Sequence, residues 1–290
     1  MAELRGVFAA AVTPLLEGGA RLDEPGVARV AEFLVEHGLD GALVCGTAGE
    51  GMLLTVAERH RALESYLAAA SGRLAIMAHC GAQTTADTVA LAAHAAEVGA
   101  VGVSVIPPPY FPLDERELLQ HLAAAARACE PLPFYIYAFT ARSGYPVPVP
   151  VIERLAERVP NLAGLKVSEA PWERFEPYLD TGLDIFVGPE ALIQRGLAGG
   201  AIGAISALAS ALPELVTAAV RTQTPEATAR ASAARAALQR FPMPAALKAV
   251  CALRGVPIAS DVRAPLRVLD SDEHAELEQV LHGLLEAVVT

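Results

Sequence analysis

Paired cysteines and clustered metal ligands are missing from this sequence. The four cysteines are far apart and form no CxxC pair, and of the seven histidines only His79, at the end of an apolar run, is a candidate metal ligand. Structural zinc sites and disulfide frameworks need closely spaced or paired ligands. We therefore expect no metal, no disulfide and reduced thiols, as in a cytoplasmic protein.

Positive charge is scarce as well. Lysine and arginine number 22 against 33 aspartates and glutamates, which gives a net charge of −11 and a pI near 5.1. A nucleic-acid-binding protein needs a basic stripe, and the sequence has none. The acidity does not exclude an anionic substrate, because one arginine or a set of backbone amides can hold a carboxylate. We expect a small-molecule partner and no nucleic acid.

Long apolar runs and nucleotide-binding motifs are also absent. No window reaches the roughly 20 uninterrupted apolar residues of a membrane span, and the first residues lack the basic start and apolar stretch of a signal peptide. Neither the Gly-x-Gly-x-x-Gly fingerprint nor the Gly-x-x-x-x-Gly-Lys phosphate loop occurs. These absences predict a protein that binds no membrane and needs no cofactor.

What the chain does have is apolar sequence in a regular alternation. Hydrophobic residues make up 53% of its 290 residues and charged residues only 19%, which is enough to fill one large α/β domain. Short apolar runs indicate strands buried on both faces of a parallel sheet. These runs are residues 6–12, 41–45, 74–80, 101–106, 134–137, 162–166, 185–188 and 203–206. Helical patterns follow them at residues 23–37, 55–70, 85–98, 114–129, 148–158, 171–179, 190–197 and 213–221.

Eight strands and eight helices in strict alternation predict the fold class. A closed (β/α)8 TIM barrel over residues 1–223 fits this count and length better than a doubly wound sheet. Three further helices are predicted at residues 224–240, 244–254 and 271–288. We expect them to form a C-terminal helical appendage, residues 224–290, that packs on the barrel.

Lys166 is the sharpest chemical signal. The chain has only two lysines, and Lys166 closes the apolar run of residues 162–166, where its amine would point into the barrel mouth. Desolvation disfavours the charged form of an amine and frees a lone pair that can attack a ketone. A lysine at a strand end can also simply extend its amine to water. The position therefore predicts a nucleophile, with a surface role as the alternative.

Other strand ends supply groups that suit such a nucleophile. Tyr137 ends the fifth strand and Tyr110 follows the fourth, and imine chemistry needs an acid or base near the new nitrogen. The small-residue loop 46–51 follows the second strand, where consecutive backbone N–H groups can hold a carboxylate. Each feature alone has an ordinary explanation as a pocket wall or a glycine-rich turn. Together they favour chemistry at one barrel mouth.

Five segments spread along essentially the whole chain share one family pattern: residues 6–14, Gly46-Thr47-Ala48-Gly49-Glu50, residues 137–144, Gly164-Leu165-Lys166, and the turn Phe241-Pro242-Met243-Pro244 with Lys248. They resemble the dihydrodipicolinate synthase and N-acetylneuraminate lyase superfamily of pyruvate-dependent class I aldolases. The resemblance implies that Lys166 forms the Schiff base with pyruvate and that Tyr137 moves its protons. It also implies a homotetramer.

The resemblance assigns the remaining residues to binding and relay roles. Thr47 and Tyr110 would complete a proton relay, with Tyr110 coming from a neighbouring subunit, and the Thr47–Ala48 amides would hold the pyruvate carboxylate. Arg142 stands where synthases bind the second substrate's carboxylate. Three more residues would line the site: Gly188, Glu190 and Ile205. Glu190 is the one acid where sialic-acid lyases have an acidic pair.

Departures from the family pattern set the order of the candidate functions. Ala48 and Ala138 replace a threonine and an asparagine of the synthases, whereas residues 135–137 and 110–112 resemble 2-keto-3-deoxygluconate aldolases. The leading prediction is a lyase that reversibly cleaves a 2-oxo-3-deoxy acid to pyruvate and an aldehyde. The alternatives are 4-hydroxy-tetrahydrodipicolinate synthase, which Arg142 favours, and a non-catalytic barrel that binds oxo acids. A metal-dependent aldolase is disfavoured because a His, Asp and Glu cluster is missing.

Overall fold

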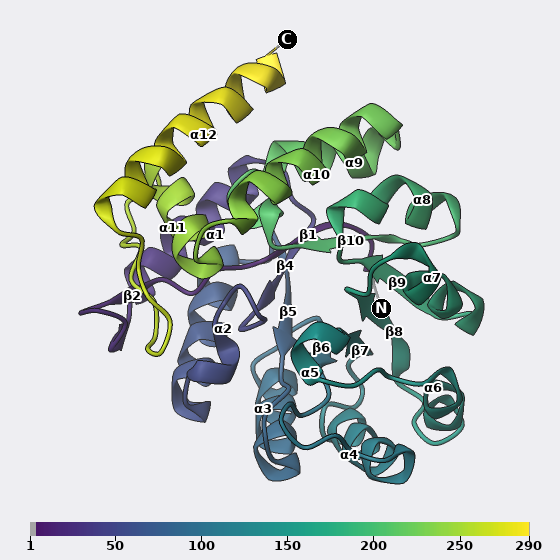
Figure 1. Ribbon diagram of the computed structural model, residues 1–290. Coiled ribbons are helices and arrows are strands. Elements are labelled where there is room, and N and C mark those ends of the chain that lie inside the picture. Colours follow the sequence, from purple (N-terminus) through teal and green to yellow (C-terminus); the bar gives the residue numbers. More distant parts are fainter. Residues whose placement is uncertain (1–3, 290) are drawn as a thin grey trace.

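Eight parallel strands close into a barrel in the computed structural model, which describes residues 4–289 (Figure 1). Around the barrel the order is β1-β10-β9-β8-β7-β6-β5-β4, so each strand lies beside its neighbour in sequence and β1 closes the ring. The strands are β1 (Gly6–Ala10), β4 (Gly41–Val44), β5 (Ala75–His79), β6 (Gly102–Val105), β7 (Phe134–Ala138), β8 (Leu162–Val167), β9 (Asp184–Val187) and β10 (Gly203–Ser206). The predicted TIM barrel is confirmed.

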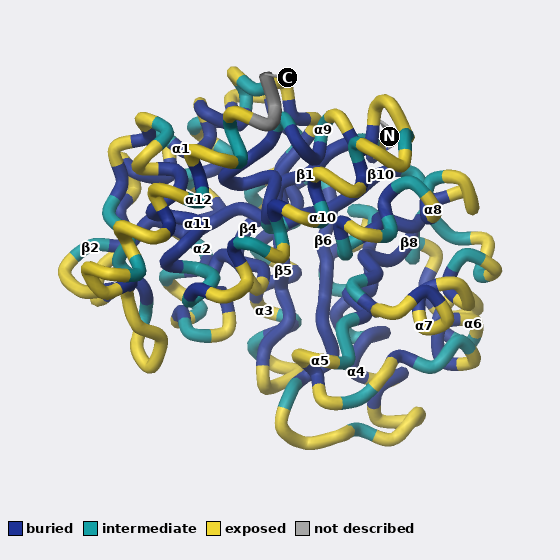
Figure 2. Tube along the Cα trace, turned by 45° about the horizontal axis from the view of Figure 1, so that its top comes forward, coloured by how far each residue is buried: buried dark blue, intermediate teal, exposed yellow. Residues whose placement is uncertain are grey.

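The strands are buried on both faces, which explains their continuous apolar runs. Every residue of β4, β6, β7 and β10 is buried (Figure 2). Inside the barrel the Phe186 ring contacts two others, Phe8 with centroids 5.3 Å apart and Tyr135 with centroids 5.8 Å apart. Tyr135 precedes Tyr137 by two residues and therefore shares its face of β7. These rings fill part of the barrel interior.

Helices follow the strands, most of them on the outside of the barrel. They are α1 (Glu24–Glu36), α2 (Val56–Ala70), α3 (Thr85–Glu97), α4 (Glu115–Ala128), α5 (Thr140–Ser143), α6 (Val149–Ala156), α7 (Trp172–Phe175), α8 (Ile193–Ala198) and α9 (Pro213–Thr222). A capping box begins α2, since Thr55 and Glu58 each accept the other's backbone N–H. Asp114 and Glu117 form a second capping box at α4.

Short elements depart from the sequence expectation. A hairpin of β2 (Leu15–Leu16) and β3 (Arg21–Leu22) follows β1, and its two-residue strands carry no periodic signal. The helix expected at residues 171–179 divides into α7 and the 3₁₀ helix η2 (Glu176–Thr181), because Pro177 cannot donate the backbone hydrogen bond that an α-helix needs. Three further 3₁₀ turns are η1 (Gly51–Leu53), η3 (Glu190–Leu192) and η4 (Leu208–Ser210).

Three helices follow the barrel: α10 (Pro225–Gln239), α11 (Met243–Leu253) and α12 (Ser271–Val289). Helix α10 packs against α9 and η3, and α12 extends along the outer edge of the molecule (Figure 1). The segment between α11 and α12 lies along the β2–β3 hairpin, where Asp261 accepts the Gly18 N–H at 2.9 Å. The division of the chain at residues 223 and 224 stays a prediction.

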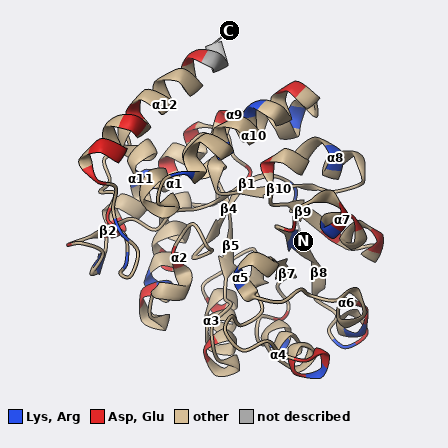
Figure 3. Cartoon of the chain, viewed as in Figure 1, with Lys and Arg blue, Asp and Glu red and all other residues tan. Residues whose placement is uncertain are grey.

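Charged residues lie mostly on the outer helices and on α12 (Figure 3). Within residues 4–289, no helix has both the length and the apolar character required to traverse a bilayer. A few charged groups are nevertheless buried, among them Glu50, Lys166, Glu190 and Lys248. Because burying a charge is costly unless it is paired or functional, these residues direct attention to the barrel mouth.

Candidate active site

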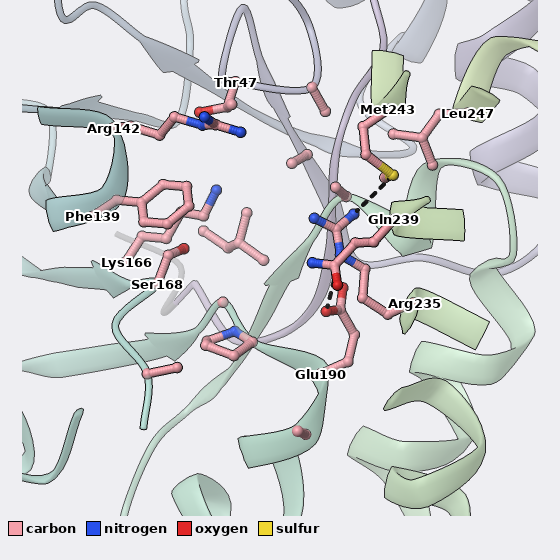
Figure 4. A pocket seen from close by; sticks show the side chains of 18 of the residues that line it. Thr47, Phe139, Arg142, Lys166, Ser168, Glu190, Arg235, Gln239, Met243 and Leu247 are labelled. Atoms are coloured by element: carbon pink, nitrogen blue, oxygen red, sulfur yellow. Dashed lines mark hydrogen bonds and ion pairs between the residues drawn. The ribbon is translucent and has the colours of Figure 1, made fainter. Parts of the chain in front are cut away.

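Lys166 lies near the carboxyl end of β8, inside the barrel mouth. Its side chain is only 3% exposed, and the register of β7 with β8 pairs it with Tyr137. The Lys166 Nζ lies 4.0 Å from the centroid of the Tyr137 ring, and Figure 4 shows the amine pointing into the pocket. The amine is therefore held against an aromatic face while its nitrogen stays open to a ligand.

The hydroxyl of Tyr137 is surrounded by groups that favour its ionised form. Burial raises the pKa of this tyrosine, but the charge of Lys166 and hydrogen bonds with Thr47 and Ser168 outweigh burial, so the pKa falls below its usual value. The Thr47 Oγ1 lies 3.4 Å from the Tyr137 hydroxyl oxygen. A phenol with a lowered pKa releases and regains a proton more readily near neutral pH, which suits an acid–base group.

The loop after β4 is packed so closely that its shape requires glycine. A Cβ at Gly51 would lie 1.8 Å from the carbonyl oxygen of Cys45. The buried Thr13 hydroxyl donates to the Gly49 carbonyl oxygen at 2.7 Å. Residues 47–48 therefore stand on a firmly held turn in the pocket wall, where backbone N–H groups can bind a carboxylate.

A buried ion pair ties this loop to the C-terminal helices. Lys248, on α11, donates to the Glu50 carboxylate at 2.6 Å, and both side chains are 0% exposed. The second carboxylate oxygen accepts the Arg263 backbone N–H at 2.7 Å, and Lys248 also donates to the Asp261 carbonyl oxygen at 2.6 Å. Burial lowers the pKa of Lys248 and the Glu50 charge opposes that shift. The appendage thus contributes directly to the shape of the loop.

We expect Lys248→Met to destabilise the protein strongly, because it leaves the Glu50 carboxylate buried without its cation. Removing one partner of a buried pair costs roughly 3–5 kcal/mol. Urea unfolding of the variant and the wild type measures the loss. The matched control is the double variant Lys248→Met/Glu50→Gln, which removes both charges and should recover part of it. A single variant as stable as the wild type would contradict the assignment.

His79 is held in the barrel wall by a backbone contact and a ring contact. Its Nδ1 lies 3.1 Å from the Cys45 carbonyl oxygen, and its ring meets the Tyr137 ring edge to face with centroids 5.9 Å apart. Burial, aided by the charges of Arg59 and Lys166, lowers the pKa of His79 well below its usual value, which disfavours the charged form of the ring. In the described part of the chain, no three His, Cys, Asp or Glu residues are placed to hold a metal. Metal independence stays a prediction.

A cavity of about 600 Å³ opens at this end of the barrel. It brings together eight of the residues selected from the sequence: Thr47, Ala48, Tyr137, Arg142, Lys166, Gly188, Glu190 and Ile205. Tyr110 is not among its lining residues. Its side chain is 83% exposed and its ring packs edge to face against Phe111. A single chain therefore does not bring Tyr110 into the expected proton relay.

Part of the cavity wall was missed from the sequence. Ser168 lines it two residues after Lys166, and a Cβ at Gly188 would lie 2.2 Å from the Ser168 Oγ, so a side chain there would displace this hydroxyl. The far wall comes from the chain after the barrel: Ser232, Arg235, Ala236, Gln239, Met243, Pro244, Leu247 and Leu266. The strand-end argument could have found Ser168. No sequence signal places α10 over the mouth.

Comparison with known proteins finds one family. The sequence matches the model of the dihydrodipicolinate synthetase family over residues 3–284. It is 36% identical to an uncharacterized DapA-like lyase of Halobacterium salinarum, with 97% of this chain and 94% of that protein covered.

Solved structures of two different enzymes are similar to the whole fold. Dihydrodipicolinate synthase from Aquifex aeolicus superposes with a TM-score of 0.90 at 27% identity, covering 97% of this chain and 98% of that one. N-acetylneuraminate lyase of Proteus mirabilis gives a TM-score of 0.88 at 28% identity, with 98% and 99% covered. Because a synthase and a lyase are nearly equally similar, the substrate has to be argued from the site.

Proposed function

The chain belongs to the dihydrodipicolinate synthetase family and is a lyase of the class I aldolase type, and on this basis we propose that Lys166 forms a Schiff base with pyruvate or with a 2-oxo acid that yields pyruvate. The observation that carries the proposal is the buried Lys166 amine, 4.0 Å from the Tyr137 ring and open to the cavity. A ketone that enters this cavity meets a nucleophile and a proton donor together.

The proposed reaction cleaves a 2-oxo-3-deoxy acid between C3 and C4. The Lys166 amine attacks the C2 carbonyl, and the carbinolamine loses its hydroxyl as water after Tyr137 donates a proton to it. The Tyr137 phenolate then removes the proton of the C4 hydroxyl, the C3–C4 electron pair moves toward the iminium, and an aldehyde leaves. The enamine takes a proton at C3, and water hydrolyses the imine to release pyruvate. Thr47 passes protons to and from the Tyr137 hydroxyl.

The pyruvate half of the substrate is proposed to lie between β4, β9 and β10. Its carboxylate would accept hydrogen bonds from the backbone N–H groups of residues 47–48 on the closely packed loop. Gly188 and Ile205 would line this end of the pocket, and both border the cavity. Ala48 offers a backbone amide but no side-chain hydroxyl, so the amides carry this binding.

The second substrate is proposed to be the aldehyde part of a sugar acid, as in a 2-keto-3-deoxygluconate aldolase. A cavity of about 600 Å³ has room for a chain longer than pyruvate. Glu190 lines it, and its carboxylate accepts a hydrogen bond from Ser206 at 2.6 Å. A fixed carboxylate of this kind suits the hydroxyl groups of a sugar acid.

Arg142 supports the second candidate, 4-hydroxy-tetrahydrodipicolinate synthase. Arg142 lies on α5 at the cavity edge, 5.8 Å from the Phe139 ring, and within residues 4–289 its guanidinium forms no ion pair. An available guanidinium can bind the carboxylate of aspartate semialdehyde. A non-catalytic barrel that binds oxo acids would not need Tyr137 poised beside Lys166.

The homotetramer is also part of the proposal. Tyr110 and Phe111 are 83% and 70% exposed, which is unusual for adjacent aromatic residues. We propose that they meet a second copy of the chain, where Tyr110 would extend the proton relay of its neighbour.

The test is a screen of pyruvate with neutral and acidic aldehydes, together with cleavage assays of 2-oxo-3-deoxy acids. We expect pyruvate release from 2-keto-3-deoxygluconate or a relative of it, and no cyclised product from aspartate semialdehyde. The reverse result would move the assignment to the synthase. Binding of pyruvate without turnover of any partner would favour the non-catalytic barrel. Arg142→Ala should raise the Michaelis constant only for acidic aldehydes.

A further inference from the structure

A second arginine reaches the cavity from outside the barrel. Arg235 lies on α10, its side chain is 25% exposed, and it lines the cavity wall. Figure 4 shows its guanidinium and that of Arg142 facing the pocket from different sides, with Lys166 in the same field. Packing of α10 against η3 brings Arg235 beside Glu190. No barrel strand supplies this cation.

Glu190 orients Arg235 without using all of its donors. One Glu190 oxygen accepts the Ser206 hydroxyl at 2.6 Å, and the other lies 3.8 Å from the Arg235 Nε, beyond hydrogen-bond length. The Arg235 Nη1 lies 3.7 Å from the Met243 sulfur, a weak acceptor. The outer edge of the guanidinium is therefore available for two parallel hydrogen bonds to an anion.

The charge of the cavity lining also favours an anionic ligand. Its charged lining residues are three cations, Arg142, Lys166 and Arg235, against the single anion Glu190. This excess of positive charge occurs in a chain whose net charge is −11. A positive cleft in an acidic protein concentrates anionic ligands. The amides of residues 47–48 are proposed to bind the pyruvate carboxylate, and Lys166 reacts as an uncharged amine, so the two arginines remain for a second anionic group.

We infer that Arg235 is a specificity-determining residue that binds an anionic group, a carboxylate or a phosphate, at the far end of the second substrate. The substrate is then a 2-oxo-3-deoxy acid with negative charge at both ends. Gln239 lies one helical turn after Arg235 on α10 and also lines the cavity, where its amide can contact the hydroxyls between the two ends. The inference rests on the proposed function for the identity of the pyruvate end.

Ligand binding to the Lys166→Ala variant, which cannot form the imine, tests the proposed anion subsite at Arg235 without catalysis. The probes are two six-carbon 2-oxo-3-deoxy acids that differ only at C6, one with a hydroxymethyl group and one with a carboxylate. Calorimetry should show about 10- to 100-fold tighter binding of the carboxylate probe, the range for a charge-assisted pair of hydrogen bonds. Adding Arg235→Gln should remove this preference and leave the hydroxymethyl probe nearly unchanged.

Two further variants make the result specific. Arg235→Lys keeps the charge but loses the planar fork, so it should retain only part of the preference. Arg230→Ala, at an exposed position on the same helix outside the cavity lining, is the matched control and should retain all of it. A 6-phosphate probe that binds more tightly still, through Arg235, would identify the anion as phosphate.

Equal affinity for the two acids in Lys166→Ala, or a preference that survives Arg235→Gln, would overturn the inference. Trapping of pyruvate on Lys166 of the wild type tests the proposed function separately. A failed trap with an intact Arg235-dependent preference would leave the subsite standing and refute the Schiff base. Successful trapping without an Arg235-dependent preference would support the proposed lyase and refute the anion subsite at Arg235.

Discussion

Replacing Lys166 by alanine is expected to abolish the adduct that pyruvate and borohydride leave on the wild-type protein. Borohydride reduces an imine to a stable secondary amine, so intact-mass measurement detects one added carboxyethyl group. Turnover should fall on the order of 10⁶-fold, the scale seen when a covalent nucleophile is removed. The buried position of Lys166, beside Tyr137, supports this amine as the proposed nucleophile.

The chain makes this experiment unusually clear because it has only one other lysine. Lys248 is 0% exposed and donates to Glu50 and to the Asp261 carbonyl, so it cannot meet pyruvate. Lys248→Arg keeps a positive charge beside Glu50 and removes the second lysine amine, so it is the matched control, and its reduced adduct should still form on Lys166. An adduct that persists in Lys166→Ala would refute the proposed mechanism.

The barrel could be predicted from the sequence because its strands are buried on both faces and therefore appear as continuous apolar runs. Residues 162–166 form one continuous apolar run, and the strand observed there, β8, differs from the expected range by a single residue. Such runs, separated by capped helices, leave few alternatives to a closed parallel barrel. The β2–β3 hairpin and α5 were not predicted, since segments of two to four residues are too short to show a period.

The candidate site was predictable where the barrel itself supplies it. Parallel strands deliver their carboxyl ends to one mouth, so Lys166, Tyr137 and the loop at residues 46–51 could be grouped from the sequence alone. Arg235 could not be found in this way, because its place depends on how α10 packs on η3. Tyr110 is the opposite case. Its position after a strand predicted a site residue, but within a single chain its side chain is exposed to solvent.

Tyr137→Phe is expected to separate chemistry from binding. The change keeps the ring, its contact with Lys166 at 4.0 Å and its edge-to-face contact with His79. It removes only the hydroxyl, whose lowered pKa and contact with Thr47 support it as the proposed proton carrier. General acid–base catalysis contributes about 10²–10⁴-fold, so kcat should fall by that order. Pyruvate binding should change far less, because the amides at residues 47–48 are proposed to hold the carboxylate.

Tyr135→Phe provides the matched control for this prediction. Tyr135 lies on the same strand and the same face, is 1% exposed, and is not a lining residue of the cavity, so loss of its hydroxyl should leave kcat nearly unchanged. Trapping of pyruvate by Tyr137→Phe should slow but still reach completion, because the Lys166 nucleophile remains. Proton transfer then limits each step that forms or breaks the imine. A Tyr137→Phe enzyme with near-normal kcat and much weaker pyruvate binding would instead make Tyr137 a wall of the pocket, and the proton carrier would have to be sought at Ser168 or Thr47.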